Sequence, residues 1–269
     1  MAEMAAYSDF TTVTARRDGH VLIVSFNRPE RRNAINAALH HDLEAILALV
    51  SADREVRAIV LRGEGKAFCA GGDVTTMEDK DEHSPAHMVL STLDTVKMLE
   101  MILSVPQPII CAVQGFAMGL GASIALLCDV LVMAEDAAIA DTHVNIGLVA
   151  GDGGAVLWPL AGSLGAARWY LMTGERVSGT EAVRLGLALK AVPADDLDPT
   201  ALAMAQRLAG IAPLAVQGTK ATLNRIVRDR IALTLDTGLL LEGATFVSED
   251  HREAASAFLE KRQPMFRGR

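Results

Sequence analysis

An almost uncharged apolar run over residues 109–134 constrains the fold more than any other feature of the sequence. Asp129 is its only charged residue, and the run is long enough to cross a bilayer. However, Gln114, Gly115, Gly119 and other small or polar residues interrupt it. It therefore predicts a buried strand, a glycine-rich turn, a buried helix and a second strand rather than a membrane span.

The pattern of hydrophobic residues in the rest of the chain changes at about residue 165. Before it, apolar β-branched runs alternate with segments of helical periodicity, and after it the pattern is mostly helical. Strands are expected at 11–15, 20–26, 57–62, 109–113, 130–134 and near 138–140. Helices are expected at 36–51, 87–104, 121–128, 166–172, 179–185, 200–209, 213–227, 231–242 and 249–260. The pattern predicts an α/β core over residues 1–199 and a helical region over 200–269, with no linker between them.

Composition narrows the possible partners and the cellular compartment. Of the 269 residues, 51% are hydrophobic, and this composition excludes a disordered chain. The net charge of −8 argues against nucleic-acid or anionic membrane partners. Cys69, Cys111 and Cys128 lack a C-x-x-C spacing, so we expect neither a disulfide framework nor a metal site. Residues 1–7 lack the features of a signal peptide, and a cytoplasmic location is expected.

Two segments, residues 67–73 and 113–123, are predicted to run from an apolar strand through glycines into a helix. Glycine lets a ligand approach the backbone closely, and the first amides of a helix have no intrahelical acceptor. Two such turns lying together could form an oxyanion hole. The alternative is that both are only tight joints between secondary-structure elements.

The order of several motifs resembles that of the crotonase family, which comprises enoyl-CoA hydratases and isomerases. The resemblance begins with Asn27-Arg28-Pro29, followed by residues 66–73 and 115–121, and continues to residues 257–266. It implies an α/β fold, namely a crotonase-like spiral of β-β-α units with a helical C-terminal trimerisation region. It also implies an acyl-CoA thioester as substrate, with coenzyme A entering only as part of it, and no metal or redox cofactor.

The resemblance assigns binding roles by position. The two amides of the oxyanion hole would be those of Gly72 and Leu120. The family's nucleotide contacts fall on Arg31, Arg32, Ala34, Ala70, Gly71, Asp73 and Val74. The two arginines suit phosphates, and the alternative is that they are two solvated loop residues. In a homotrimer or a dimer of trimers, Lys261 and Phe266 would lie near a neighbouring subunit's nucleotide; alternatively, the C-terminal helices fold back on their own core.

The sequence departs from the family at the two catalytic glutamates, whose positions hold Ser123 and His143. Hydration of an enoyl thioester needs both a base and an acid, and an imidazole with a pKa near 6.5 could serve. His143 could equally be structural. Asp152 is the nearest replacement carboxylate, although a role as N-cap of the following helix is slightly favoured. Asp141 is either a further acid–base residue or an orienting group for His143.

The leading expectation is therefore an enzyme of the hydratase or lyase class that stabilises a thioester enolate. Other crotonase reactions remain open because they can run without the two glutamates, namely isomerisation, decarboxylation, C–C cleavage and thioester hydrolysis. A family member that binds acyl-CoA without turning it over is the alternative from a different functional class.

Overall fold

The computed structural model describes residues 7–73 and 85–269, so Val74 lies outside the described residues. Within them, the main sheet has the strand order β1-β2-β3-β4-β6-β9, with β1 and β2 antiparallel and all later neighbours parallel. Its strands are β1 (Val13–Asp18), β2 (Val21–Phe26), β3 (Ala58–Gly63), β4 (Ile109–Val113), β6 (Val130–Ala134) and β9 (Lys190–Val192). A smaller sheet orders β5 (Phe116–Met118), β7 (Ala138–Ala140) and β8 (Val177–Ser178).

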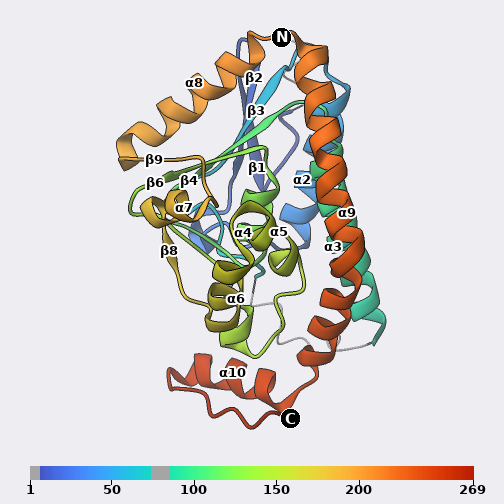
Figure 1. Cartoon of the computed structure of the whole chain (residues 1–269), viewed down its shortest axis with the longest axis vertical. Coiled ribbons are helices and arrows are strands. Elements are labelled where there is room, and N and C mark those ends of the chain that lie inside the picture. The colour runs from blue at the N-terminus through green and yellow to red at the C-terminus, as the bar shows by residue number, and fades with distance from the viewer. Residues whose placement is uncertain (1–6, 74–84) are drawn as a thin grey trace.

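Helices surround the main sheet and extend beyond it (Figure 1). The α-helices are α2 (Ala37–Ala52), α3 (Pro85–Ser104), α4 (Leu120–Leu127), α5 (Gly154–Ala161), α6 (Leu164–Thr173), α7 (Gly179–Leu185), α8 (Leu197–Ala209), α9 (Pro213–Phe246) and α10 (Glu249–Glu260). Short 3-10 helices occur at η1 (Pro29–Arg31), η3 (His143–Ile146) and η4 (Ala194–Asp196). The long helix α9 runs beside α3, and α10 lies at one end of the molecule (Figure 1).

The apolar run at 109–134 folds as its interruptions predict. It forms β4, the short strand β5, α4 and β6, and the first and last of these pair in parallel inside the main sheet. Among the described residues, no single helix is long and apolar enough to cross a membrane. The pair of α9 and residues 249–257, bent by 67°, meets that test by length and composition.

The predicted α/β fold is confirmed, but three details differ. The helices predicted at 213–227 and 231–242 form the single helix α9, because the polar residues between them include neither glycine nor proline. The strands β5, β8 and β9 were missed because two or three residues give too short a pattern. The predicted boundary at residues 199 and 200 lies inside α8, which packs on the main sheet, and the division into two regions stays a prediction.

The hydrophobic core lies between the main sheet and the helices. All six residues of β2 are buried, as a strand covered on both faces requires. Phe26 at the end of this strand packs against Phe68, with ring centroids 5.3 Å apart. Since Phe68 lies in the first glycine-rich segment, this contact anchors that segment to the core.

Candidate active site

The two glycine-rich segments lie side by side. Cys69 and Ala117 form a parallel bridge, and the Met118 amide donates to the Cys69 carbonyl over 3.0 Å. Gly71 has φ +91°, and a Cβ atom there would lie 2.8 Å from the Met118 carbonyl oxygen. Both facts explain why glycine is needed at this point, where two backbones meet. The expected convergence of the two turns is therefore confirmed.

The amides of Gly72 and Leu120 both lie in these turns. Among the residues that the structure describes, neither amide donates a hydrogen bond to a backbone oxygen outside regular elements. Leu120 is the first residue of α4, and its N-cap Gly119 has φ +49°. A Cβ atom on Gly119 would lie 3.5 Å from Cε1 of His143, which puts the imidazole beside this turn. Amide groups at two neighbouring turns can stabilise an oxyanion, and this role of Gly72 and Leu120 stays a prediction.

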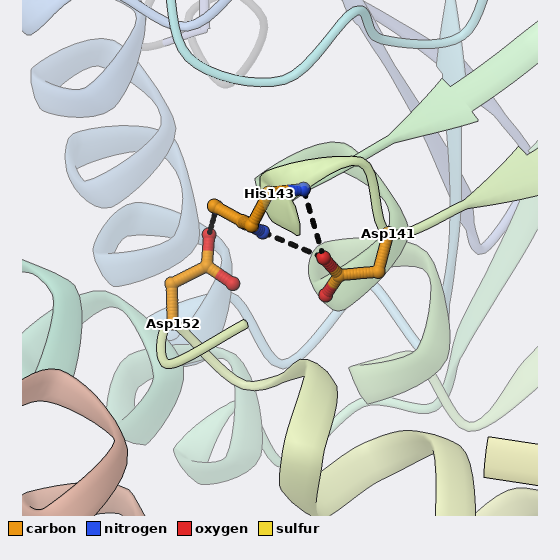
Figure 2. Close-up of side chains that lie close together, drawn as sticks. All are labelled: Asp141, His143 and Asp152. Atoms are coloured by element: carbon orange, nitrogen blue, oxygen red, sulfur yellow. Dashed lines mark hydrogen bonds and ion pairs between the residues drawn. The ribbon is translucent and has the colours of Figure 1, made fainter. Parts of the chain in front are cut away.

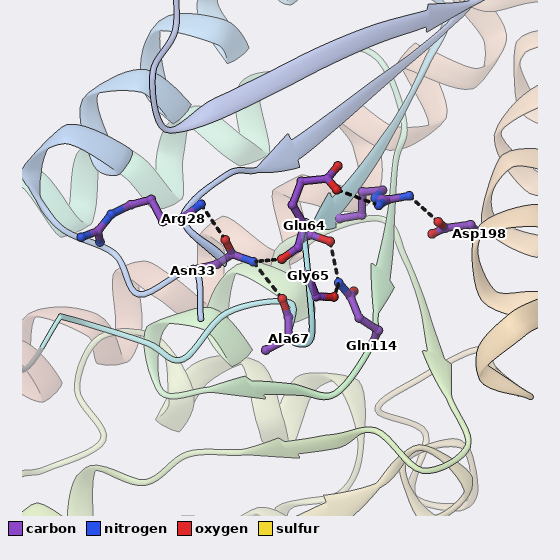
Figure 3. Close-up of polar contacts among 9 residues, drawn as sticks. Arg28, Asn33, Glu64, Gly65, Ala67, Gln114 and Asp198 are labelled. Carbon is purple, nitrogen blue, oxygen red and sulfur yellow. Dashed lines mark hydrogen bonds and ion pairs between the residues drawn. The ribbon is translucent and has the colours of Figure 1, made fainter. Parts of the chain in front are cut away.

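A network of polar contacts connects the loop after β2 to the loop after β3, next to the first glycine-rich segment (Figure 3). Asn33 has φ +55°, and its amide nitrogen donates to the carbonyls of Glu64 and Ala67 over 2.9 and 2.8 Å. Its side-chain oxygen accepts from the Arg28 amide over 2.9 Å. The Arg28 guanidinium in turn forms an ion pair with Asp73 over 3.0 Å. These contacts link both ends of the segment that carries Gly72 to the loop after β2.

Most residues predicted to contact the nucleotide come together beside this turn. Backbone hydrogen bonds join the loop after β2 to the segment before α3: Ala70 N to Arg32 O, Ile35 N to Gly71 O, and Asp73 N to Ile35 O. Arg31 and Arg32 are exposed, while Ala34 is buried. The arrangement leaves both arginines available to an anion, and their contact with a nucleotide stays a prediction.

His143 is held between carboxylates (Figure 2). Asp141 follows β7 and His143 begins η3, so the two do not share a strand. The Nδ1 atom of His143 lies 2.7 Å from Asp141 Oδ1, and its Nε2 atom lies 3.4 Å from Asp152 Oδ2. This geometry fits the expected orienting role of Asp141, since a carboxylate at Nδ1 fixes the ring and its tautomer.

Asp152 does not cap the following helix, so the slightly favoured N-cap interpretation is wrong. The N-cap of α5 is Gly153, with φ +131° and no side-chain hydrogen bond. The Asp152 carboxylate instead turns to His143 and accepts a hydrogen bond from the Ser123 hydroxyl over 3.3 Å. The glycine conformation at residue 153 lets the turn direct Asp152 inward, which sequence spacing could not reveal.

Glu242 completes the cluster and was missed by the sequence analysis. It comes from α9, and its Oε1 atom lies 3.8 Å from Nε2 of His143. The sequence nevertheless contained a pattern that could have identified Glu242. Ile231, Leu235 and Leu239 mark the buried face of α9, and Glu242 continues that face three residues later. A lone carboxylate on an apolar helix face indicates a functional or paired group.

The electrostatics of the cluster favour bound protons. Burial alone would lower the pKa of His143, but the charges of Asp152 and Asp141 and their hydrogen bonds hold it well above 6.5. Burial, followed by repulsion from Asp152, raises the pKa of Glu242 to about 8. At neutral pH the cluster therefore holds an imidazolium and a neutral carboxyl group. Such perturbed groups gathered in one place are typical of acid–base sites.

The same side chains could also bind a metal ion. Asp141, His143 and Asp152 each offer one ligand atom, and these atoms lie within 4.8 Å of one another. However, a ligand on Nε2 would have to replace the proton that faces Asp152 and Glu242. The expectation of a reaction without a metal stays a prediction.

The C-terminal tail folds over the start of α10. Lys261 and Phe266 are exposed on this tail, and their predicted approach to a neighbouring subunit's nucleotide stays a prediction. The tail is fixed by Asp250, whose carboxylate accepts from the amides of Arg267 and Gly268 over 2.6 and 2.7 Å. The helix α10 also contacts η3, which carries His143.

Comparison with known proteins identifies the family. Residues 16–269 match the family model described as enoyl-CoA hydratase/isomerase. Short-chain-enoyl-CoA hydratase of Clostridium acetobutylicum is 30% identical, covering 95% of this chain and 97% of its own length. 2,3-Dehydroadipyl-CoA hydratase of Escherichia coli is 32% identical, covering 94% and 97% respectively.

Solved structures show the same fold. An enoyl-CoA hydratase/isomerase from Mycobacterium paratuberculosis superimposes with a TM-score of 0.85 at 36% identity, covering 92% of this chain and 99% of that chain. A carnitinyl-CoA dehydratase from Mycobacterium avium gives a TM-score of 0.83 at 33% identity, covering 96% and 99%. These matches confirm the crotonase-like α/β fold, and the chain belongs to the enoyl-CoA hydratase/isomerase family.

Proposed function

We propose that this protein is a lyase of the hydratase type that acts on acyl-CoA thioesters. The observation that carries the proposal is the cluster at His143, which lies beside the turn of Gly119 and holds exchangeable protons at neutral pH. Relatives whose names describe enoyl-CoA hydration or carnitinyl-CoA dehydration support the same reaction class. Coenzyme A takes part as a portion of the substrate, and the chemistry needs no other cofactor.

In this proposal the thioester carbonyl accepts hydrogen bonds from the amides of Gly72 and Leu120. Charge that develops on its oxygen as a Cα–H bond breaks is thereby stabilised, and one such donor contributes about 10²–10³ in rate. His143 and Asp152 act as one unit, in which the Asp152 carboxylate takes up and returns the Cα proton beside the protonated imidazole. Asp141 orients the imidazole, and Ser123 orients the Asp152 carboxylate.

Binding and assembly follow the family pattern in this proposal. Arg31 and Arg32 are exposed at the loop after β2 and would meet the nucleotide phosphates. We also propose a homotrimer or a dimer of trimers, located in the cytoplasm. The exposed apolar side chains of α9, among them Leu233, Leu240 and Leu241, support an assembly that buries them.

A panel of enoyl-CoA and 3-hydroxyacyl-CoA thioesters of different chain length tests the proposal, with products followed by mass spectrometry. The proposal predicts interconversion of at least one pair, with loss of most of the rate in His143→Ala or Asp152→Asn. Acyl-CoA binding should persist in both variants. Binding without any product across the panel would instead favour the non-catalytic alternative, and a product of another class would favour another crotonase reaction.

A further inference from the structure

We propose that Glu242, contributed by α9, is a second proton donor of the site and acts on an oxygen attached to Cβ of the acyl group. The substrate class would then be β-oxygenated acyl-CoA thioesters. This inference rests on the proposed function and adds a residue from outside the α/β core to its chemistry.

Close backbone contact fixes the position of Glu242. A Cβ atom on Gly151 would lie 2.4 Å from the Gly238 carbonyl oxygen and 2.7 Å from Oε2 of Glu242. The turn that carries Asp152 and the helix that carries Glu242 therefore touch without intervening side chains. This contact holds the Glu242 carboxyl group at the imidazole, where its Oε1 atom lies 3.8 Å from Nε2 of His143.

The hydrogen bonding of Glu242 is incomplete. The residue is only 9% exposed, and within the described part of the chain its Oε2 atom has no hydrogen-bond partner. A buried carboxyl oxygen without a hydrogen bond is unfavourable, so a bound ligand that offers a polar atom is preferred over one that does not. A purely hydrocarbon acyl chain offers none, whereas a hydroxyl or carbonyl oxygen at Cβ does.

The neighbouring charges favour the protonated form of Glu242. The titratable groups that face it are His143 of η3, Asp152 of the turn before α5, and Asp141 after β7. Two carboxylates and one imidazolium already give this buried cluster a net negative charge, and an ionised Glu242 would add another. A pKa of about 8 leaves the carboxyl group able to donate a proton at neutral pH.

Dehydration of a 3-hydroxyacyl-CoA shows how the protons balance. The Cα–H bond breaks, its proton moves to the Asp152 carboxylate of the His143–Asp152 pair, and its electrons form the Cα–Cβ double bond. The Cβ–O bond breaks with its electron pair remaining on oxygen, and that oxygen takes the Glu242 proton and leaves as water. The proton on the pair then passes to the Glu242 carboxylate, which restores the resting state. Hydration is the same sequence in reverse.

Glu242→Gln tests the proposal because glutamine keeps the size of the side chain but has no proton to transfer. The matched control is Asp236→Asn, since Asp236 lies on the same helix and is exposed. Two rates are measured on thioesters of short, medium and long chain. One is dehydration of 3-hydroxyacyl-CoA, and the other is deuterium exchange at Cα of the matched saturated acyl-CoA, which needs no β oxygen.

We expect Glu242→Gln to lower the dehydration rate about 10²–10⁴-fold while Cα exchange stays within a few-fold of wild type. Wild-type dehydration should also decline as pH rises through the pKa of Glu242, and this decline should be missing from the residual activity of the variant. Asp236→Asn should change neither rate.

Three outcomes would overturn the inference. Dehydration within tenfold of wild type in Glu242→Gln would show that no proton comes from this residue. Equal loss of exchange and dehydration would show that Glu242 only positions the His143–Asp152 pair. Wild-type protein that dehydrates but loses no activity at alkaline pH would also contradict it. Wild-type protein that catalyses neither reaction would refute the proposed function as well, which separates the two failures.

Discussion

Replacing Lys220 by methionine should strongly destabilise the protein, because this residue joins α9 to the main sheet. Its Nζ atom donates to Asp129 Oδ2 over 2.6 Å and to the Gln107 carbonyl over 3.0 Å. The Lys220 side chain is 7% exposed and that of Asp129 is 20% exposed. Methionine keeps most of the length but leaves the Asp129 carboxylate without its cation.

The magnitude follows from what Asp129 retains. Removing one partner of a buried ion pair costs about 3–5 kcal/mol. Asp129 still accepts a hydrogen bond from the Ile109 amide over 2.7 Å and keeps some contact with solvent, so we expect the lower end, about 3 kcal/mol. Urea unfolding followed by circular dichroism, at fixed protein concentration, measures this loss.

An exposed pair on the same helix supplies the control. Arg228 pairs with Glu100 over 2.9 Å, but their side chains are 31% and 42% exposed, so Arg228→Met should cost less than about 1 kcal/mol. If Lys220→Met costs no more than Arg228→Met, the argument from burial is refuted. In the double variant Lys220→Met with Asp129→Asn, the losses should be less than additive, because the unpaired charge is gone.

Further predictions concern the site and the assembly. Gly72→Pro deletes one oxyanion donor, so turnover should fall about 10²–10³-fold while CoA binding changes little; equal turnover would contradict the assignment. Gly151→Ala forces a Cβ atom against the Gly238 carbonyl and should lower both the unfolding midpoint and turnover, whereas wild-type values would disprove the close contact. The free energy of unfolding should fall as the pH rises from about 5 to 8, because folded Glu242 keeps a proton that the unfolded chain loses near pH 4.5. Calorimetry should show a weaker dependence of this free energy on pH in Glu242→Gln, and the same dependence as in wild type would contradict the prediction. Truncation after Ala254 should weaken assembly and CoA affinity, and a wild-type chain that sediments as a monomer at micromolar concentration would defeat this expectation.

The sequence predicted the parts of the fold that depend on local pattern. The two longer strands and the helix of the run at 109–134 could be predicted because its glycines fall at strand ends, where Gly115 and Gly119 adopt positive φ. The three-residue strand β5 between these glycines was missed. The sequence showed that two glycine-rich turns could form an oxyanion hole if they lay together, and the close approach at Gly71 that brings them together is visible only in the structure. Helix α7 was predicted with the bounds that the structure has, since Ser178 caps it and Gly186 ends it.

The features that sequence analysis missed depend on distant contacts. Glu242 lies on the buried face of α9, but which atoms it meets is decided by the docking of α9 on the turn at Gly151. The orientation of Asp152 depends on the backbone of Gly153, and an aspartate before an apolar helix fits a cap equally well. The edge strand β9 is defined by its pairing with β6 rather than by its own three residues.

Deuterium exchange at Cα of a saturated acyl-CoA is the most direct test of the central claim, that His143 and its carboxylates replace the two glutamates. We predict that wild-type protein catalyses the exchange and that His143→Gln lowers its rate by about 10²–10⁴-fold with CoA binding unchanged. Exchange at the wild-type rate in His143→Gln would contradict the account.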